Sequence, residues 1–209
     1  MKFPRARLIV MSKAPVPGRV KTRLIPLLGE TGAAFLHQAL LDATLAKLSR
    51  AGLCPVELCC APDTRHAYFA EARNRYPLTL SVQSDGDLGL RMSTAIRQGL
   101  QQSQDVVLVG TDCPGLDAAD VDAALAQLAA GNDVVLGPAS DGGYYLIAMH
   151  RHHPALFEDM PWGSDRVLEL TLQRVNAGGL TCALLGMRGD IDTPDDYLAW
   201  QQQRAAAGA

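Results

Sequence analysis

The feature that most constrains the fold of this chain is a regular alternation of short β-rich apolar runs with longer helical patterns. Between the runs, residues 31–51 and 118–130 carry leucine, valine and alanine at helical spacing. Apolar strands that alternate with helices are typical of a mainly parallel sheet covered on both faces. We therefore predict a three-layer α/β/α sandwich. Its strands are expected at residues 8–11, 56–61, 78–82, 106–110, 134–137, 144–149 and 180–185.

Length and composition favour a single domain. With 209 residues, of which 48% are hydrophobic, the chain can bury one sizeable core. We expect residues 1–204 to form this domain and residues 205–209 to be a frayed tail. The formal net charge of -3 argues against general affinity for nucleic acid or for anionic membranes.

The cysteines and the apolar segments indicate a cytoplasmic protein. The 5 cysteines include no CxxC motif, and an odd set of this kind is typical of buried thiols in a reducing compartment. The apolar stretch near the N-terminus is too short for a signal peptide, and no window is apolar for long enough to span a bilayer. We expect a monomer or homodimer that binds neither membranes nor nucleic acid.

The segment KAPVPGRVKTRL, at residues 13–24, directly follows the first apolar run and places four cations around two prolines and a glycine. Like charges this close repel one another, so such a cluster is tolerable when an anion neutralises it. The segment differs from a P-loop, because its single glycine cannot provide the same nest of backbone N–H groups. Arginine offers phosphate a planar fork, and lysine adds a compact charge. We favour phosphate binding over a solvated loop for Lys13, Arg19, Lys21 and Arg23.

Aspartates follow three other predicted strands. Asp112 lies in GTDCPG, Asp141 in SDGG, and Asp190 and Asp192 in the DIDTP segment after the last strand. In open parallel sheets the ligand site lies beyond the carboxyl ends of the strands, so these residues and the basic segment are expected to converge on one edge. Magnesium bound to a nucleotide needs one or two protein carboxylates. For Asp112 alone, a role in capping a turn is equally well supported.

Local structure explains some of these polar residues without any function. The threonine, proline and two aspartates at residues 193–196 suit the N-cap and first turn of a helix. Capping of the helix does not explain Asp190 and Asp192, and one of these two aspartates can face a metal. Gly142 and Gly143 allow a ligand to approach the backbone closely, although for these glycines alone a tight turn is the better explanation.

In order and spacing, these motifs resemble the nucleotide-diphospho-sugar transferase superfamily, which has the Rossmann-like glycosyltransferase-A fold. More closely, the chain is similar to a bacterial family known as transferase 1 associated with radical-SAM and selenodomain proteins. More distantly, it is similar to molybdenum-cofactor and 2-phospholactate guanylyltransferases, which also pair a basic first loop with an aspartate-proline metal motif. The resemblance covers nearly the whole chain, through KAPVPGRVKTRL, GDLGLRM, GTDCPGL, SDGGYYLI, PWGS and DIDTPDD.

This resemblance implies roles for individual residues. Asp112 and Asp192 would ligate Mg²⁺ or Mn²⁺, and Arg19 and Lys21 would act together with Asp112 in catalysis. Trp162 would stack on an acceptor, although packing in the core is equally common for a tryptophan. The residues expected to contact substrates are Lys13, Pro15, Gly18, Arg23, Asp141, Gly142, Gly143 and Trp162.

The resemblance also implies a magnesium-dependent transferase that uses a nucleoside triphosphate or a nucleotide sugar and a small-molecule acceptor. Glycosyltransferases of this fold usually carry an Asp-x-Asp metal motif, whereas Thr111-Asp112-Cys113 supplies a single aspartate. Together with the basic first loop, this favours nucleotidyl transfer to a small phosphorylated or hydroxyl acceptor, with guanine and uridine nucleotides as the first candidates. Glycosyl transfer from a nucleotide sugar is the alternative, and a non-catalytic nucleotide-binding module is a second one.

Overall fold

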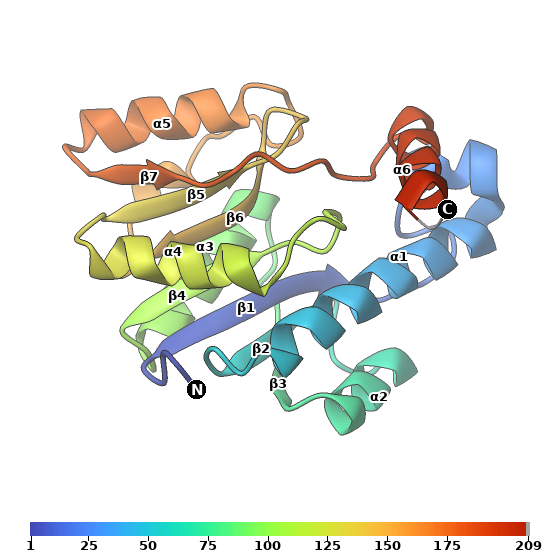
Figure 1. Ribbon diagram of the computed structural model, residues 1–209, viewed down its shortest axis with the longest axis horizontal. Helices are drawn as coiled ribbons and strands as arrows, with labels where there is room; N and C mark the ends of the chain where they lie inside the picture. Colours follow the sequence, from blue (N-terminus) through green and yellow to red (C-terminus); the bar gives the residue numbers. More distant parts are fainter. Residues whose placement is uncertain (208–209) are drawn as a thin grey trace.

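Seven strands form one sheet in the computed structural model, which describes residues 1–207 (Figure 1). The strand order is β3-β2-β1-β4-β6-β5-β7, and β6 runs antiparallel to both of its neighbours while the other pairs are parallel. The predicted mainly parallel sheet is thus confirmed. The strands are β1 (Ala6–Lys13), β2 (Val56–Ala61), β3 (Leu78–Val82), β4 (Asp105–Val109), β5 (Val134–Pro138), β6 (Tyr144–Met149) and β7 (Cys182–Leu184).

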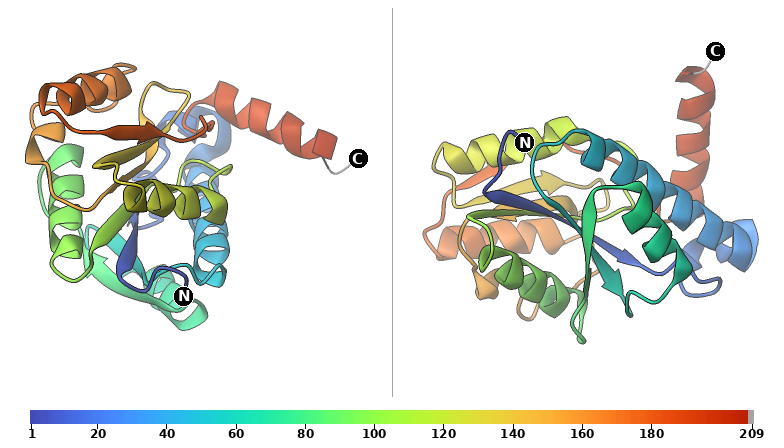
Figure 2. Two further views of the ribbon diagram at one scale, coloured as in Figure 1. Left: turned by 60° about the vertical axis from the view of Figure 1, so that its left-hand side comes forward. Right: turned by 90° about the horizontal axis from the view of Figure 1, so that it is seen from below.

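Helices cover both faces of this sheet, which confirms the predicted three layers (Figures 1 and 2). Helices α1, α2 and α4 pack on one face and α3 and α5 on the other, each group through its own apolar cluster. The helices are α1 (Ile25–Arg50), α2 (Ala67–Arg75), α3 (Leu88–Leu100), α4 (Ala118–Ala129), α5 (Val167–Ala177) and α6 (Pro194–Ala207), with short 3₁₀ turns η1 (Thr22–Leu24) and η2 (Pro154–Leu156).

The central strand β1 shows why the strands are apolar on both sides. Ile9 and Val10 are both fully buried, and because successive side chains point to opposite faces, Ile9 packs in the cluster with α3 and Val10 in the cluster with α1. Strands β1, β4 and β5 run in the same direction, so the chain segments after them emerge at one edge. The turn between β5 and the antiparallel β6 also lies at that edge.

Two helices that bear on the site begin with side-chain caps. In α4, Asp117 and Asp120 form a reciprocal capping box. In α6, the Thr193 hydroxyl accepts from the Asp196 amide at 3.3 Å, while the Asp196 carboxylate accepts from the Thr193 amide at 2.7 Å. The predicted capping role of residues 193–196 is therefore confirmed, and the helix continues to Ala207, into the segment expected to be a tail.

A third apolar cluster joins the start of α1 to α6, which projects from the edge of the molecule (Figure 2). Leu24 and Ile191 are fully buried in it, and Tyr197 and Trp200 of α6 pack against it. By length and composition, the stretch Thr22–Arg50 is long and apolar enough to cross a membrane, so the expectation that no window meets this criterion is wrong. A core helix meets the same criterion, and the buried leucines of α1 pack against the sheet.

Candidate functional site

A cleft of about 580 Å³ opens at the carboxyl edge of the sheet. The first loop (residues 13–24), the loop after β4, the β5–β6 turn and the segment between β7 and α6 all contribute to its walls. The convergence expected from the strand ends is therefore present. The expected site residues that line the cleft are Lys13, Arg19, Lys21, Arg23, Asp112, Asp141, Gly143, Trp162, Asp190 and Asp192. Three others, Pro15, Gly18 and Gly142, do not line it.

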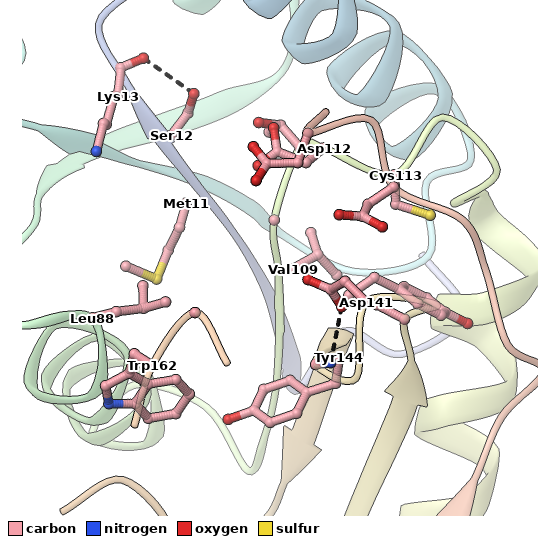
Figure 3. A pocket seen from close by; sticks show the side chains of 18 of the residues that line it. Met11, Ser12, Lys13, Leu88, Val109, Asp112, Cys113, Asp141, Tyr144 and Trp162 are labelled. Carbon is pink, nitrogen blue, oxygen red and sulfur yellow. Dashed lines mark hydrogen bonds between the residues drawn. The ribbon is translucent and has the colours of Figure 1, made fainter. Parts of the chain in front are cut away.

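The two sides of the cleft differ in chemistry (Figure 3). Asp112 and Asp141 lie on one side, whereas Met11, Leu88 and Trp162 form an apolar group on the other. A cleft with carboxylates on one side and apolar side chains on the other suits a ligand that joins a metal-binding part to a ring.

Lys21 holds three segments of the site together. Its backbone is in the left-handed region at φ 47°, and its side chain is only 3% exposed. The ammonium lies 2.6 Å from Oδ1 of Asp112 and also donates to the carbonyl of Ile191. The amide of Ile191 in turn donates to the Asp112 carbonyl at 2.8 Å. The first loop, the loop after β4 and the β7–α6 segment are therefore fixed to one another at this point.

Arg23 makes a second ion pair at the same end of the cleft. Its Nη1 donates to Oδ2 of Asp192 at 2.5 Å, and both side chains are partly open to solvent. Within residues 1–207, Lys13 and Arg19 form no ion pair. Two cations of the first loop thus hold the two aspartates, while the charges of the other two are not neutralised by any carboxylate within these residues.

The chemistry of the donor set defines which metal the site suits. Within residues 1–207, no group of three His, Cys, Asp or Glu side chains is placed to hold a metal ion by itself. Asp112 uses one carboxylate oxygen for Lys21, and its other oxygen makes no hydrogen bond within this part of the chain. A hard divalent cation needs six or more oxygen ligands, so phosphate and water would supply most of them. These residues fit a cation that arrives together with phosphate.

A second carboxylate pair adds negative charge beside Asp192. Burial, and next the negative charge of Asp141, raise the pKa of Asp190 above its ordinary value. The Ser140 hydroxyl lies 3.4 Å from Oδ1 of Asp190, and the amide of Gly143 donates to Oδ1 of Asp141 at 2.8 Å (Figure 3). This part of the cleft therefore favours a cation, whichever of Asp190 and Asp192 contacts it.

His37 and Gln83 are site residues that sequence reasoning missed. Nε2 of the buried His37 lies 3.0 Å from the Lys13 carbonyl oxygen and 3.2 Å from the Ser12 hydroxyl, and burial lowers the pKa of its imidazole. The Gln83 amide donates to the carbonyls of Ser12 and Cys59, at 3.1 and 2.8 Å. Both residues fix the end of β1. His37 lies in an apolar helix pattern that carries no sign of a site.

Gly142 and Trp162 are placed mainly by packing. A Cβ on Gly142, where φ is 86°, would lie 2.0 Å from the carbonyl oxygen of Asp165, so the glycine is required by a close backbone contact. Trp162 packs over Gly89, where a Cβ would lie 2.4 Å from the indole Nε1, and meets Tyr144 edge-on at 6.3 Å between ring centroids. Trp162 therefore both packs in the core and lines the cleft.

Comparison with known proteins identifies the family. Residues 44–164 match the family model described as "Uncharacterized protein conserved in bacteria (DUF2064)", which covers more than half of the chain. The chain belongs to the DUF2064 family. A search of curated proteins found no match. The matched region of this DUF2064 member begins within α1 and ends just after Trp162, so it includes the Asp112 and Asp141 loops but not the first loop.

Solved structures place this DUF2064 protein in the nucleotide-diphospho-sugar transferase superfamily, as its motifs predicted. A protein from Desulfovibrio desulfuricans G20 described as a nucleotide-diphospho-sugar transferase is 30% identical, with a TM-score of 0.81, over 91% of this chain and 83% of that one. At the general level, the chain is therefore a transferase of this superfamily.

More distant structures share the fold alone. CMP:2-keto-3-deoxy-manno-octonic acid synthetase complexed with CTP is 13% identical, with a TM-score of 0.59, over 97% of this chain and 99% of that one. Rv0371c from Mycobacterium tuberculosis H37Rv, in complex with manganese, is 18% identical, with a TM-score of 0.55, over 93% of this chain and 97% of that one.

Proposed function

We propose that the protein is a magnesium-dependent transferase that uses a nucleoside-phosphate donor and transfers a nucleotidyl group to a small phosphorylated or hydroxyl acceptor. The observation that carries this proposal is that the cations Lys13 and Arg19, which have no ion-pair partner within residues 1–207, line the same cleft as Asp112 and Asp192. Unpaired cations and carboxylates in one cleft suit the two parts of a metal-bound nucleoside triphosphate, its phosphates and its metal ion.

In this mechanism an acceptor oxygen attacks the donor α-phosphorus and pyrophosphate leaves. Arg19 and Lys13 bind the β- and γ-phosphates and stabilise the charge that gathers on the leaving group. Lys21 keeps the Asp112 carboxylate in place and adds positive charge beside it. A divalent cation held by Asp112 and Asp192 would neutralise donor oxygens. The transfer depends on positioning and charge, so the protein needs no covalent nucleophile.

The distant structures are consistent with these ligand classes. The synthetase of the same fold binds CTP, and Rv0371c binds manganese. We extend both classes to this chain, with Mg²⁺ or Mn²⁺ as the metal and a nucleoside triphosphate as the donor. The apolar side of the cleft, with Met11, Leu88 and Trp162, is the proposed place for a ring of the donor or the acceptor.

Glycosyl transfer from a nucleotide sugar is the alternative, supported by the description of the relative from Desulfovibrio desulfuricans. Against it, the loop after β4 offers a single aspartate, because Gly110 and Pro114 stand at the two positions where an Asp-x-Asp motif could place its other aspartate. A non-catalytic nucleotide-binding module remains the second alternative.

Product analysis separates these functions. We expect the purified protein with Mg²⁺, screened with nucleoside triphosphates against phosphosugar and sugar-alcohol acceptors, to release pyrophosphate, because the first-loop cations favour that leaving group. A parallel screen with nucleotide sugars is the control and should release no nucleoside diphosphate. Diphosphate release with nucleotide sugars and none of pyrophosphate with triphosphates would make the protein a glycosyltransferase.

Substitution of Arg19 tests the phosphate-binding role of the first loop. Arg19→Ala should weaken the affinity for GTP or UTP by about 10-fold or more, because a hydrogen bond to a charged group contributes about 1.5–3 kcal/mol. Calorimetric titration measures this change directly. Arg50→Ala, at the far end of α1 and outside the cleft, is the matched control. Equal affinities for the two variants and the wild type would remove Arg19 from the site.

A further inference from the structure

The ion pairs Lys21–Asp112 and Arg23–Asp192, which engage the two proposed metal ligands, differ in their exposure to solvent. The Lys21 side chain is 3% exposed and also bonds the Ile191 carbonyl, so its pair with Asp112 is held by the fold. The Arg23 side chain is 62% exposed and that of Asp192 36%, and the guanidinium makes no other hydrogen bond within the described residues. Exposed pairs of this kind are weak. One pair is fixed, therefore, and the other is free to break.

In the exposed pair, the Arg23 guanidinium that phosphate would bind and the Asp192 carboxylate that the metal would bind are bonded to each other. Asp192 is the proposed metal ligand, yet one of its oxygens accepts from Arg23 at 2.5 Å. A divalent cation that approaches alone meets the positive charge of Arg23 and must displace it. Phosphate that approaches alone finds the same guanidinium already bound to a carboxylate. Either ligand by itself has to break the pair and leaves one of its members without a counter-charge.

We propose that Arg23 and Asp192 exchange partners when metal and nucleotide bind, Arg23 moving to phosphate and Asp192 to the metal. This inference rests on the proposed function and adds a coupling to it: each ligand frees the group that the other one binds. Metal alone and nucleotide alone therefore bind weakly, and the metal–nucleotide complex binds tightly. By thermodynamic linkage, the coupling has the same size from either side.

Two substitutions should each produce a gain of affinity, which general damage to the site cannot imitate. Arg23→Gln leaves Asp192 unpaired, and we expect it to bind Mn²⁺ without nucleotide about two- to fivefold more tightly than the wild type, the range that an exposed ion pair allows. Asp192→Asn leaves Arg23 unpaired, and we expect it to bind GTP in EDTA more tightly by a similar factor. Electron paramagnetic resonance of free Mn²⁺ and calorimetry give the two affinities.

Matched controls separate the exchange from a simple change of net charge. Arg19→Gln removes a cation from the same loop but breaks no ion pair, and Asp141→Asn removes a carboxylate from the same cleft without breaking the Arg23 ion pair. The proposal requires Arg23→Gln to gain more Mn²⁺ affinity than Arg19→Gln, and Asp192→Asn to gain more GTP affinity than Asp141→Asn. Equal gains within the Mn²⁺ pair overturn it, and so do equal gains within the GTP pair when GTP binds.

The Mn²⁺ measurement also keeps this inference separate from the proposed function. It contains no nucleotide, so it reports on the Arg23–Asp192 pair even if the chain uses another donor. If no variant binds GTP, with or without metal, the choice of donor fails, while a selective Mn²⁺ gain in Arg23→Gln still supports the release of Asp192. If GTP binds and Mn²⁺ affinity is the same in Arg23→Gln and Arg19→Gln, the exchange fails and the proposed function stands.

Discussion

Asp112→Asn is expected to lower metal-dependent turnover by more than about 100-fold, because loss of a group behind a metal ligand already costs about 10- to 100-fold. The stability should change little. Asparagine keeps an oxygen that can accept from Lys21, and the Asp112 side chain is 53% exposed, so the lost charge contributes about 1 kcal/mol or less. For a chain of this size, that corresponds to a fall in Tm of about 2–4 °C. Initial rates across a Mg²⁺ titration, together with thermal unfolding, measure both effects.

Asp122→Asn is the matched control for this change. Asp122 lies on α4, pairs with Lys2 at the surface and does not line the cleft, so both rate and Tm should stay at wild-type values. If Asp112→Asn instead unfolds while the metal dependence of turnover survives, Asp112 is a turn residue. The metal would then be held elsewhere in the cleft, which Asp141, Asp190 and Asp192 also line.

Gly142→Ala is expected to cause the largest loss of stability among single substitutions at the cleft edge, about 2–6 kcal/mol. One part, about 1–3 kcal/mol, comes from placing a side chain at φ 86°. The other part, about 1–3 kcal/mol, comes from overpacking, because the new Cβ would lie 2.0 Å from the carbonyl oxygen of Asp165. Denaturant unfolding with linear extrapolation gives the change in the free energy of unfolding.

Gly131→Ala isolates the backbone contribution. Gly131 has φ 100°, and a Cβ there would meet no heavy atom within 4 Å, so only the first of the two costs applies. We expect Gly142→Ala to be the more destabilising of the two by about 1–3 kcal/mol. Equal losses would mean that the Asp165 backbone moves aside, and Gly142 would again be open to a role in ligand approach.

Much of the fold could be predicted from local sequence patterns. All of the predicted strands are present, because buried β-branched runs bounded by polar turns are a strong local signal. The antiparallel direction of β6 could not be predicted, since strand direction depends on tertiary connection. Helix α1 begins before the predicted residue 31 because Pro26 suits a first turn and Gly29, at φ 68°, accommodates a kink that interrupts the leucine pattern. Helices α2 and α5 were not predicted.

The sequence predicted which residues form the candidate site better than it predicted the contacts between them. Strand ends alone placed the first loop, Asp112 and Asp192 at one edge, because parallel strands bring their carboxyl ends together. The pairing of Lys21 with Asp112 requires contacts between residues far apart in the sequence, which no local pattern encodes. The expectation that Lys21 is a free phosphate ligand remains untested, and its burial favours the holding role. His37 was missed for the same reason.

The cluster that joins α1 to α6 has a consequence for substrate choice. Leu24 immediately follows Arg23, and Ile191 immediately precedes Asp192. Both apolar side chains are fully buried in that cluster. The backbones that carry the two charged side chains are thus anchored on the same apolar body before any ligand arrives. The distance between these two backbone positions is then fixed, and the entropy of ordering the two backbones is already lost on folding. We expect a site built in this way to discriminate between ligands by their size, and Tyr197 and Trp200 of α6 to help set the distance through their packing against the cluster.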